Sequence, residues 1–191
     1  MRMGELVYMD YVRMFNNMHP GFFQSDNIRN RSEEDVFTEL VMDLHKDMTD
    51  IRPVPCPKGI TFGEYHGDPD ILRKAVSLVE SDWVQYYGDD DRFFCAFDGE
   101  NIVSFCILED MGCHQGMHTG GPGCVGTIPE MRGQGIGLEM VRRATLVLKK
   151  ENFDISWIHY THLDHWYMKI GYTPVLRWNS RGIIQDPGKP A

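Results

Sequence analysis

The chain contains 191 residues, of which 42% are hydrophobic and 25% are charged, and its formal net charge is −9. A chain of this length and composition buries one sizeable core, which excludes a disordered or low-complexity protein. Its acidic balance opposes contact with phosphate backbones and anionic lipid surfaces, so neither nucleic acid nor a membrane is expected as a partner.

The sequence shows no sign of export or membrane insertion. No apolar run approaches the roughly 20 residues that a membrane-spanning helix needs. The chain begins Met-Arg-Met-Gly-Glu and soon reaches Asp10 and Arg13, unlike a secretion signal. Its five cysteines are odd in number and lack paired close spacing, which favours reduced thiols. We therefore expect a cytoplasmic protein.

The first part of the chain is predicted to be helical. Apolar side chains on most faces of residues 5–18 predict a buried helix, which Pro20-Gly21 ends. Residues 19–23, His-Pro-Gly-Phe-Phe, form an unusually aromatic loop. This loop either anchors the segment to the core or covers a substrate site as a lid.

A second helix is predicted over about residues 33–44. Residues 32–35, Ser-Glu-Glu-Asp, resemble a capping box, and the apolar residues that follow recur at helical spacing. An extended connector follows, marked by Pro53, Pro55 and Pro57. Residues 1–58 are thus expected to form an N-terminal helical extension, and residues 59–191 the main domain.

The main domain begins with strand patterns. A strand is predicted near 60–65, and Asp68-Pro69 predicts a helix start with Asp68 as its N-cap. Two β-rich runs, 93–97 and 102–108, flank the hairpin signal Asp-Gly-Glu-Asn. A glycine-rich loop containing Met111, Cys113, His114 and His118 is expected next, before a strand at 123–128.

The remaining elements alternate between helix and strand. A helix is predicted from Gly135 to about Lys150, then a half-buried strand at 153–160, a short helix and a last strand. The order β, α, β, β, β, α, β, α, β predicts an α/β (α+β) fold, with a mixed sheet and helices on both faces.

The segment Val125–Leu138 is predicted to bind a phosphate. It reads as a strand, a Pro and a turn with glycines at alternate positions, followed by a helix. The first turn of a helix presents N–H groups that lack partners, and glycines let an anion approach them closely. A P-loop needs Gly-Lys-Ser/Thr and a dinucleotide fingerprint needs Gly-x-Gly-x-x-Gly, and neither spacing occurs in this segment.

The pattern that does fit is Arg-x-x-Gly-x-Gly, formed by Arg132, Gly135 and Gly137. With a strand and Pro129 before it and an amphipathic helix after it, this closely resembles the acyl-CoA pyrophosphate loop of the GNAT superfamily of N-acetyltransferases. The resemblance implies the GNAT fold, with a mixed, mostly antiparallel central sheet. It covers roughly residues 59 to 180.

A second motif supports the resemblance. Many GNAT members have a helix ending in Tyr, three residues, Gly and an aromatic residue, which matches Tyr167, Gly171 and Tyr172. Gly171 would adopt the left-handed conformation after the helix, and Pro174 prevents the helix from resuming. The family often places an Asn before this helix. This chain has none there, and Thr161 is expected to supply a hydroxyl instead.

The resemblance implies acetyl-CoA as co-substrate, with no metal. The backbone of Val125 and Thr127 would hold the pantetheine arm. The pyrophosphate would be bound by residues 132–138, which are Arg132, Gly133, Gln134, Gly135, Ile136, Gly137 and Leu138. Tyr167 would protonate the departing thiolate.

The implied reaction is direct acetyl transfer to a primary amine in a ternary complex. The acceptor would be a small molecule or a peptide, and a homodimer remains open. Glu109 is the first choice as base, with Asp110, His118 and His159 as alternatives.

Three rival interpretations remain open. The first is an acyl-CoA-binding sensor or interaction module without turnover. The second is a metal site at His159, His162 and His165 with His114 and His118, although neither Cys-x-x-Cys nor His-Glu-x-x-His accompanies them. The third is a thiol nucleophile at Cys113 or Cys124.

Overall fold

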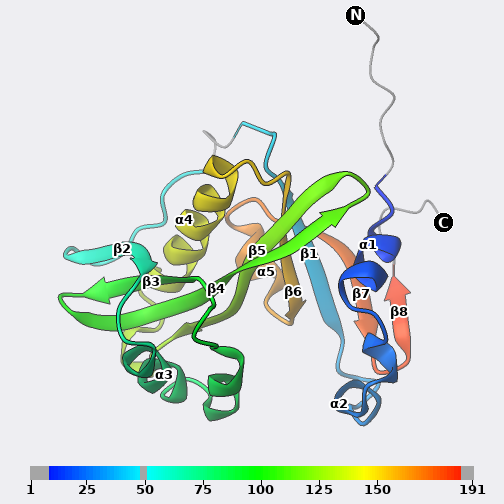
Figure 1. Cartoon of the computed structure of the whole chain (residues 1–191), viewed down its shortest axis with the longest axis horizontal. Coiled ribbons are helices and arrows are strands. Elements are labelled where there is room, and N and C mark those ends of the chain that lie inside the picture. Colours follow the sequence, from blue (N-terminus) through cyan, green and yellow to red (C-terminus); the bar gives the residue numbers. More distant parts are fainter. Residues whose placement is uncertain (1–8, 48–50, 186–191) are drawn as a thin grey trace, which may run out of the picture.

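The computed structural model describes residues 9–47 and 51–185, and within them eight strands form one sheet in the order β2-β3-β4-β5-β6-β1-β7-β8 (Figure 1). Every neighbouring pair of these strands is antiparallel except β5 and β6. This mixed, mostly antiparallel sheet with helices confirms the predicted fold class.

The described elements have the following bounds. The helices are α1 (Tyr11–Met18), α2 (Asp26–Arg29), α3 (Pro69–Ser77), α4 (Ile136–Lys150) and α5 (Asp164–Met168), with 3-10 turns η1 (Phe22–Gln24), η2 (Ser81–Tyr86) and η3 (Pro129–Met131). The strands are β1 (Phe37–Asp43), β2 (Ile60–Tyr65), β3 (Phe93–Asp98), β4 (Asn101–His114), β5 (Met117–Thr127), β6 (Ile155–Thr161), β7 (Thr173–Asn179) and β8 (Gly182–Gln185).

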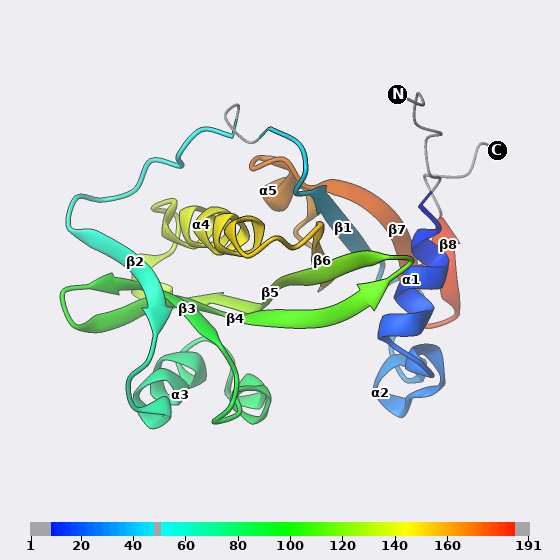
Figure 2. The ribbon, with the colours of Figure 1, turned by 45° about the horizontal axis from the view of Figure 1, so that its top comes forward.

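The sheet is covered on both faces, as expected. Figure 2 shows α4 and α5 above the sheet and α3 below it. Alternate strand residues face opposite layers, so Ile158 packs with α4 whereas its neighbour Trp157 packs with Met14 and Phe15 of α1. The second face therefore carries two separate apolar clusters, one under α1 and one under α3.

Local signals placed several elements correctly. Asp68 caps α3, its side chain accepting a hydrogen bond from the Asp70 N–H at 2.9 Å. Helix α4 begins at Ile136 after Gly135, as predicted. The helix over 5–18 is observed from Tyr11, and residues 5–8 lie outside the described part of the chain.

The predicted helix over 33–44 is wrong, because this segment contains strand β1, which lies between β6 and β7. The Ser32 hydroxyl does accept a hydrogen bond from the Glu34 N–H, but a strand follows the turn. All residues of β1 except Asp43 are buried, and a segment buried on both faces lacks the alternation that would distinguish a strand from a helix. The sheet thus includes residues from the expected extension.

The predicted loop around Met111 to His118 is also wrong. Strands β4 and β5 continue through it as a long antiparallel hairpin, whose register reaches His114 and Met117. Glu109 therefore lies within β4, opposite Gly121 of β5, and not at a strand end.

Strands β5 and β6 separate soon after they meet. Within the described residues they pair at Thr119 and Gly120 of β5. Gly121 still touches β6, because a Cβ at this position would overlap the Trp157 carbonyl oxygen. Beyond Gly121, the edge of β5 that faces β6 has no strand partner among the described residues.

Replacing Gly121 with Ala should destabilise the fold by about 3 kcal/mol, because the new methyl group would push β5 and β6 apart. Gly63 of β2 is the matched control, since a Cβ there meets nothing within 4 Å. The Gly63→Ala variant should gain about 0.5 kcal/mol from the lost chain entropy. Urea unfolding measures both variants, and equal stabilities would contradict the close contact of β5 with β6.

Candidate active site

The glycine turn, which contains Gly133 and Gly135, follows β5 and immediately precedes α4. Gly133 and Gly135 have φ angles of 74° and 81°, in the left-handed region that favours glycine. Gly135 occupies the N-cap position and no side chain caps this end of the 15-residue helix. The first N–H groups of α4 are thus left for a ligand, and an anion there also gains from the helix dipole.

The other predicted residues of the turn divide into exposed and buried groups. Arg132 is exposed, and its Nε donates to the Thr127 carbonyl at 3.0 Å. Gln134 is also exposed and donates to the Glu130 carbonyl. Ile136 and Leu138 point into the core, so they can offer a ligand only their backbone.

The proline connector lies against this turn. A Cβ on Gly135 would overlap the Pro55 carbonyl oxygen, so only glycine fits. The Val54 N–H donates to Glu139 of α4 at 2.8 Å. Glu139 is buried and also accepts hydrogen bonds from Arg142 and Arg143 at 2.7 Å. No local sequence signal marks Glu139 as the residue that holds the connector.

A β-bulge shapes the unpaired edge of β5. Phe105 pairs with Gly126 and Ile107 with Gly123, so Cys124 and Val125 together oppose a single residue of β4. Cys124 has a φ of 46°, and its carbonyl accepts a 2.6 Å hydrogen bond from the buried Tyr87 hydroxyl. The bulge re-orients the backbone where the pantetheine arm is predicted to lie.

Tyr167 of α5 belongs to the apolar cluster on the α4 side of the sheet, against which Val125 of β5 also packs. The side chain is 5% exposed, and burial raises the pKa of its hydroxyl. That hydroxyl makes no hydrogen bond to any described residue, in contrast to Tyr172, which bonds to Ser156 and Thr145 at 2.7 Å. Tyr167 thus stays protonated, as an acid must be before it acts.

Thr161 is the last residue of β6, and its hydroxyl already has a local role. The oxygen accepts a hydrogen bond from the Leu163 N–H at 2.9 Å. The hydroxyl proton remains available, so the predicted contact with the pantetheine arm stays a prediction.

Glu109 of β4 lies on the opposite face of the sheet, the face that α1 and α3 cover. Its side chain belongs to neither of the two apolar clusters on that face. Its carboxylate sits over Gly123, since a Cβ there would overlap Glu109 Oε1. Burial raises the pKa of Glu109, and the positive charge of His159 opposes that effect. A carboxylate with a raised pKa suits a base near neutral pH.

The other candidate bases are placed differently. The His118 ring bonds to Asp110 at 3.0 Å and stacks on Phe153, near the start of β5. Along the strands, His118 lies roughly 20 Å and Asp110 roughly 13 Å from the bulge. His159 of β6 instead shares the face of Glu109 and contacts Glu39, a buried carboxylate that the sequence analysis had assigned to a helix.

The aromatic loop packs onto this second face. Phe22 lies edge-on to Trp178 and to His159, with ring centroids 4.9 and 5.2 Å apart. His19 stacks on His159 at 4.0 Å. The loop therefore anchors the extension to the core and also borders the His159 ring.

His19 gives stability a pH dependence. Burial and, next, the charge of His159 lower the pKa of His19 to about 4, so the folded protein holds it neutral. The unfolded chain binds this proton below about pH 6.5, so the free energy of unfolding should fall as pH drops from 6.5 towards 4, by up to about 1.4 kcal/mol per pH unit. Urea unfolding of His19→Gln should show a smaller slope. The exposed His165→Gln should keep the wild-type slope, and equal slopes for all three proteins would contradict the assignment.

The rival chemistries find little support in the geometry. Burial and then the nearby Glu109 carboxylate raise the pKa of Cys124 to about 12, which keeps the thiol protonated and a poor nucleophile. His159 bonds to Glu39, and His162 to the Val36 carbonyl. Among the described residues, no three His, Cys, Asp or Glu side chains are grouped to hold a metal ion.

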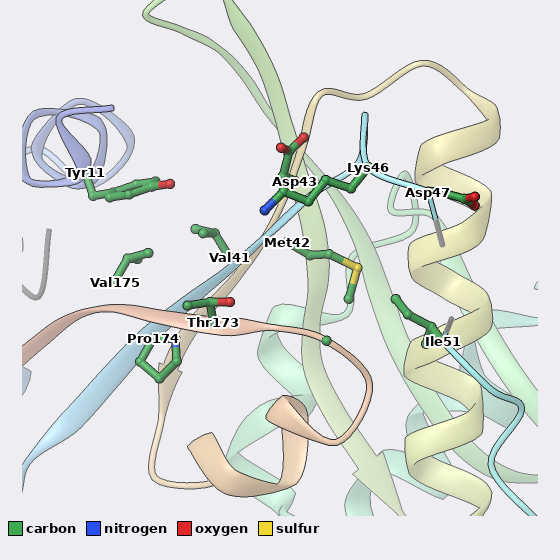
Figure 3. Close-up of a pocket in the computed structure, with 11 residues that line it drawn as sticks. Tyr11, Val41, Met42, Asp43, Lys46, Asp47, Ile51, Thr173, Pro174 and Val175 are labelled. Carbon is green, nitrogen blue, oxygen red and sulfur yellow. The ribbon is translucent and has the colours of Figure 1, made fainter. Parts of the chain in front are cut away.

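A cavity of about 550 Å³ lies between β1, β7 and α1, outside the predicted site (Figure 3). Tyr11 reaches into it from α1, with its hydroxyl directed towards Asp43 and Lys46, while Val41, Pro174 and Val175 line its apolar side. None of the residues predicted to bind acetyl-CoA or to act in catalysis lines it.

No helix in the described part of the chain is both long and apolar enough to cross a membrane.

Comparison with known families agrees with this geometry. Residues 89–174 match the acetyltransferase (GNAT) domain family, and this stretch includes β4, β5, the glycine turn, α4 and Tyr167. This part of the chain is therefore similar to the acetyltransferase (GNAT) domain, in agreement with the resemblance that the motifs indicated. No curated protein sequence matches the chain.

Solved structures share the fold at low sequence identity. The glucosamine N-acetyltransferase region of a fungal multi-domain GH3 β-N-acetylglucosaminidase is 22% identical over 83% of this chain, with a TM-score of 0.60. A tandem GNAT protein of the clavulanic acid pathway is 17% identical over 78%, with a TM-score of 0.58. A GCN5-related N-acetyltransferase from Sphaerobacter thermophilus is 16% identical over 75%, with a TM-score of 0.55. The chain covers 22%, 53% and 50% of these proteins, respectively.

Proposed function

We propose that the protein is an N-acetyltransferase that moves the acetyl group of acetyl-CoA directly to a primary amine in a ternary complex. The observation that carries this proposal is the turn at Gly133 and Gly135. It presents the uncapped start of α4 beyond the end of β5, and β5 no longer pairs with β6 after Gly120.

In this proposal the N–H groups of the turn and of the first turn of α4 bind the pyrophosphate, and Arg132 adds positive charge. The pantetheine arm lies along the unpaired edge of β5, against the backbone of Val125 and Thr127. Tyr167 donates a proton to the CoA thiolate as the C–S bond breaks. The protein supplies position and proton transfer, while the thioester supplies the activated acetyl group.

The acceptor enters from the face that carries Glu109. Asp91 also interacts electrostatically with Glu109, and the whole chain has a net charge of −9. We therefore propose a cationic amine as acceptor, with Glu109 attracting its ammonium group and serving as a candidate base. We also propose that the reaction takes place in the cytoplasm and that the protein forms a homodimer.

Release of the CoA thiol in the presence of an amine panel tests this function. The panel should contain polyamines, peptide N-termini, aminoglycosides and glucosamine, the last because one structural neighbour is a glucosamine N-acetyltransferase region. Thiol release that depends on one class of amine is the expected result. Binding of acetyl-CoA without release by any amine would favour the sensor interpretation.

A further inference from the structure

A fully buried carboxylate lies behind the proposed acceptor face. Glu39 of β1 is 0% exposed, and its two oxygens meet ring and backbone nitrogens of four residues. The indoles of Trp157 and Trp178 donate at 2.6 and 2.7 Å, the Tyr160 N–H at 3.1 Å, and Nδ1 of His159 lies at 3.0 Å. Burial alone would raise the pKa of Glu39, but the charge of His159 and these donors hold it below its ordinary value.

This carboxylate fixes the tautomer of His159. An ionised Glu39 can only accept hydrogen bonds, so Nδ1 of the ring must carry a hydrogen, and whenever the ring is neutral its lone pair is on Nε2. Nε2 makes no hydrogen bond to any described residue, and the side chain is 23% exposed. The stacked His19 and the edge of Phe22 hold the ring plane.

The position of His159 fits the proposed reaction. It lies on β6 beyond the point where β5 and β6 separate, on the same face as Glu109. The titratable groups around the ring are Glu39 of β1, His19 after α1, Glu109 of β4 and Tyr160 of β6. A held imidazole with a free Nε2 beside a carboxylate is an arrangement suited to taking a proton from an ammonium group.

We propose that His159 is the base of the reaction and that Glu39 is its positioning residue, an inference that rests on the proposed acetyl transfer. Nε2 takes one proton from the acceptor ammonium, and the neutral nitrogen then forms the C–N bond to the acetyl carbon as the C–S bond breaks. The thiolate receives the Tyr167 proton, and the second proton leaving the nitrogen returns to Tyr167 through solvent. Glu39 stabilises the charge that His159 acquires until its proton passes to water.

The tautomer can be tested without any activity. Long-range proton–nitrogen NMR correlation of the histidine rings, with His159 assigned from the signals missing in His159→Asn, should show the Nδ1–H form near neutral pH. An Nε2–H form would overturn the proposal. This result is independent of turnover, so it separates failure of this inference from failure of the proposed function.

Kinetics with an accepted amine provide the second test. In His159→Asn the introduced amide can still donate to Glu39 but cannot act as a base, so this variant should lower kcat about 100-fold or more without weakening acetyl-CoA binding. His162→Asn, at a histidine bonded to the Val36 carbonyl, is the matched control and should keep its activity. If Glu109→Gln loses turnover while His159→Asn retains it, the base is Glu109 and the proposal is wrong.

Glu39→Gln tests the positioning role. The variant should lower kcat and populate the Nε2–H tautomer of His159, because the ring loses the anionic acceptor that fixes the hydrogen on Nδ1. A purely structural role would lower stability and leave the tautomer unchanged, which would contradict the assignment. Should Glu39→Gln fail to fold, the tautomer and the His159→Asn kinetics still decide the question.

Discussion

Replacing Gly133 with Asp should weaken acetyl-CoA binding by about 100-fold or more. The new carboxylate would lie beside the bound pyrophosphate, and juxtaposed like charges cost several kcal/mol. Gly133 is the better position for this test, because a Cβ there meets nothing within 4 Å, whereas one on Gly135 would strike the Pro55 carbonyl. Calorimetric titration of the variant with acetyl-CoA measures the loss.

The control for this prediction is Gly133→Asn. Asn and Asp have nearly the same shape and tolerate a positive φ better than other side chains, so both variants strain the turn equally. Only Asp adds charge, and the Asn variant should bind far more tightly. Equal affinities for the two variants would mean that the pyrophosphate does not bind at this turn.

Replacing Tyr167 with Phe should lower kcat by about 100-fold and leave the affinity for acetyl-CoA unchanged. The buried hydroxyl makes no hydrogen bond to any described residue, so its removal leaves no protein group unsatisfied. Steady-state kinetics of thiol release and calorimetric titration separate the two quantities.

Tyr172→Phe is the matched control for this variant. Its hydroxyl bonds to Ser156 and Thr145, so its loss should reduce stability by about 1–3 kcal/mol and leave the chemistry intact. If Tyr167→Phe retains wild-type kcat, or if both variants lose kcat equally, Tyr167 is not the acid.

The sequence predicted the parts of the site that depend on local structure. The turn at Gly133 and Gly135 and the start of α4 are encoded within a few consecutive residues, so spacing and residue type were sufficient. The same holds for Gly171, whose φ of 98° follows the end of α5. These signals also indicated the resemblance to the GNAT superfamily.

The parts that failed depend on contacts between distant segments. Glu39 lies in a run with helical spacing, and only pairing with β6 and β7 shows that its carboxylate meets Trp157 and Trp178, more than 100 residues away. No sequence pattern joins Glu39 to His159. The long β4–β5 hairpin was missed because its glycines resemble a loop, whereas Gly120 and Gly121 are buried in the sheet where a side chain has no room.

The proposed function depends on binding of the acetyl-CoA pyrophosphate at the start of α4. Calorimetric titration of the purified wild-type chain with acetyl-CoA and with CoA measures this binding. We expect micromolar affinity for both ligands, with one site per chain. Absence of binding to either ligand would contradict this expectation, and would mean that Gly133 and Gly135 serve only the geometry of the turn.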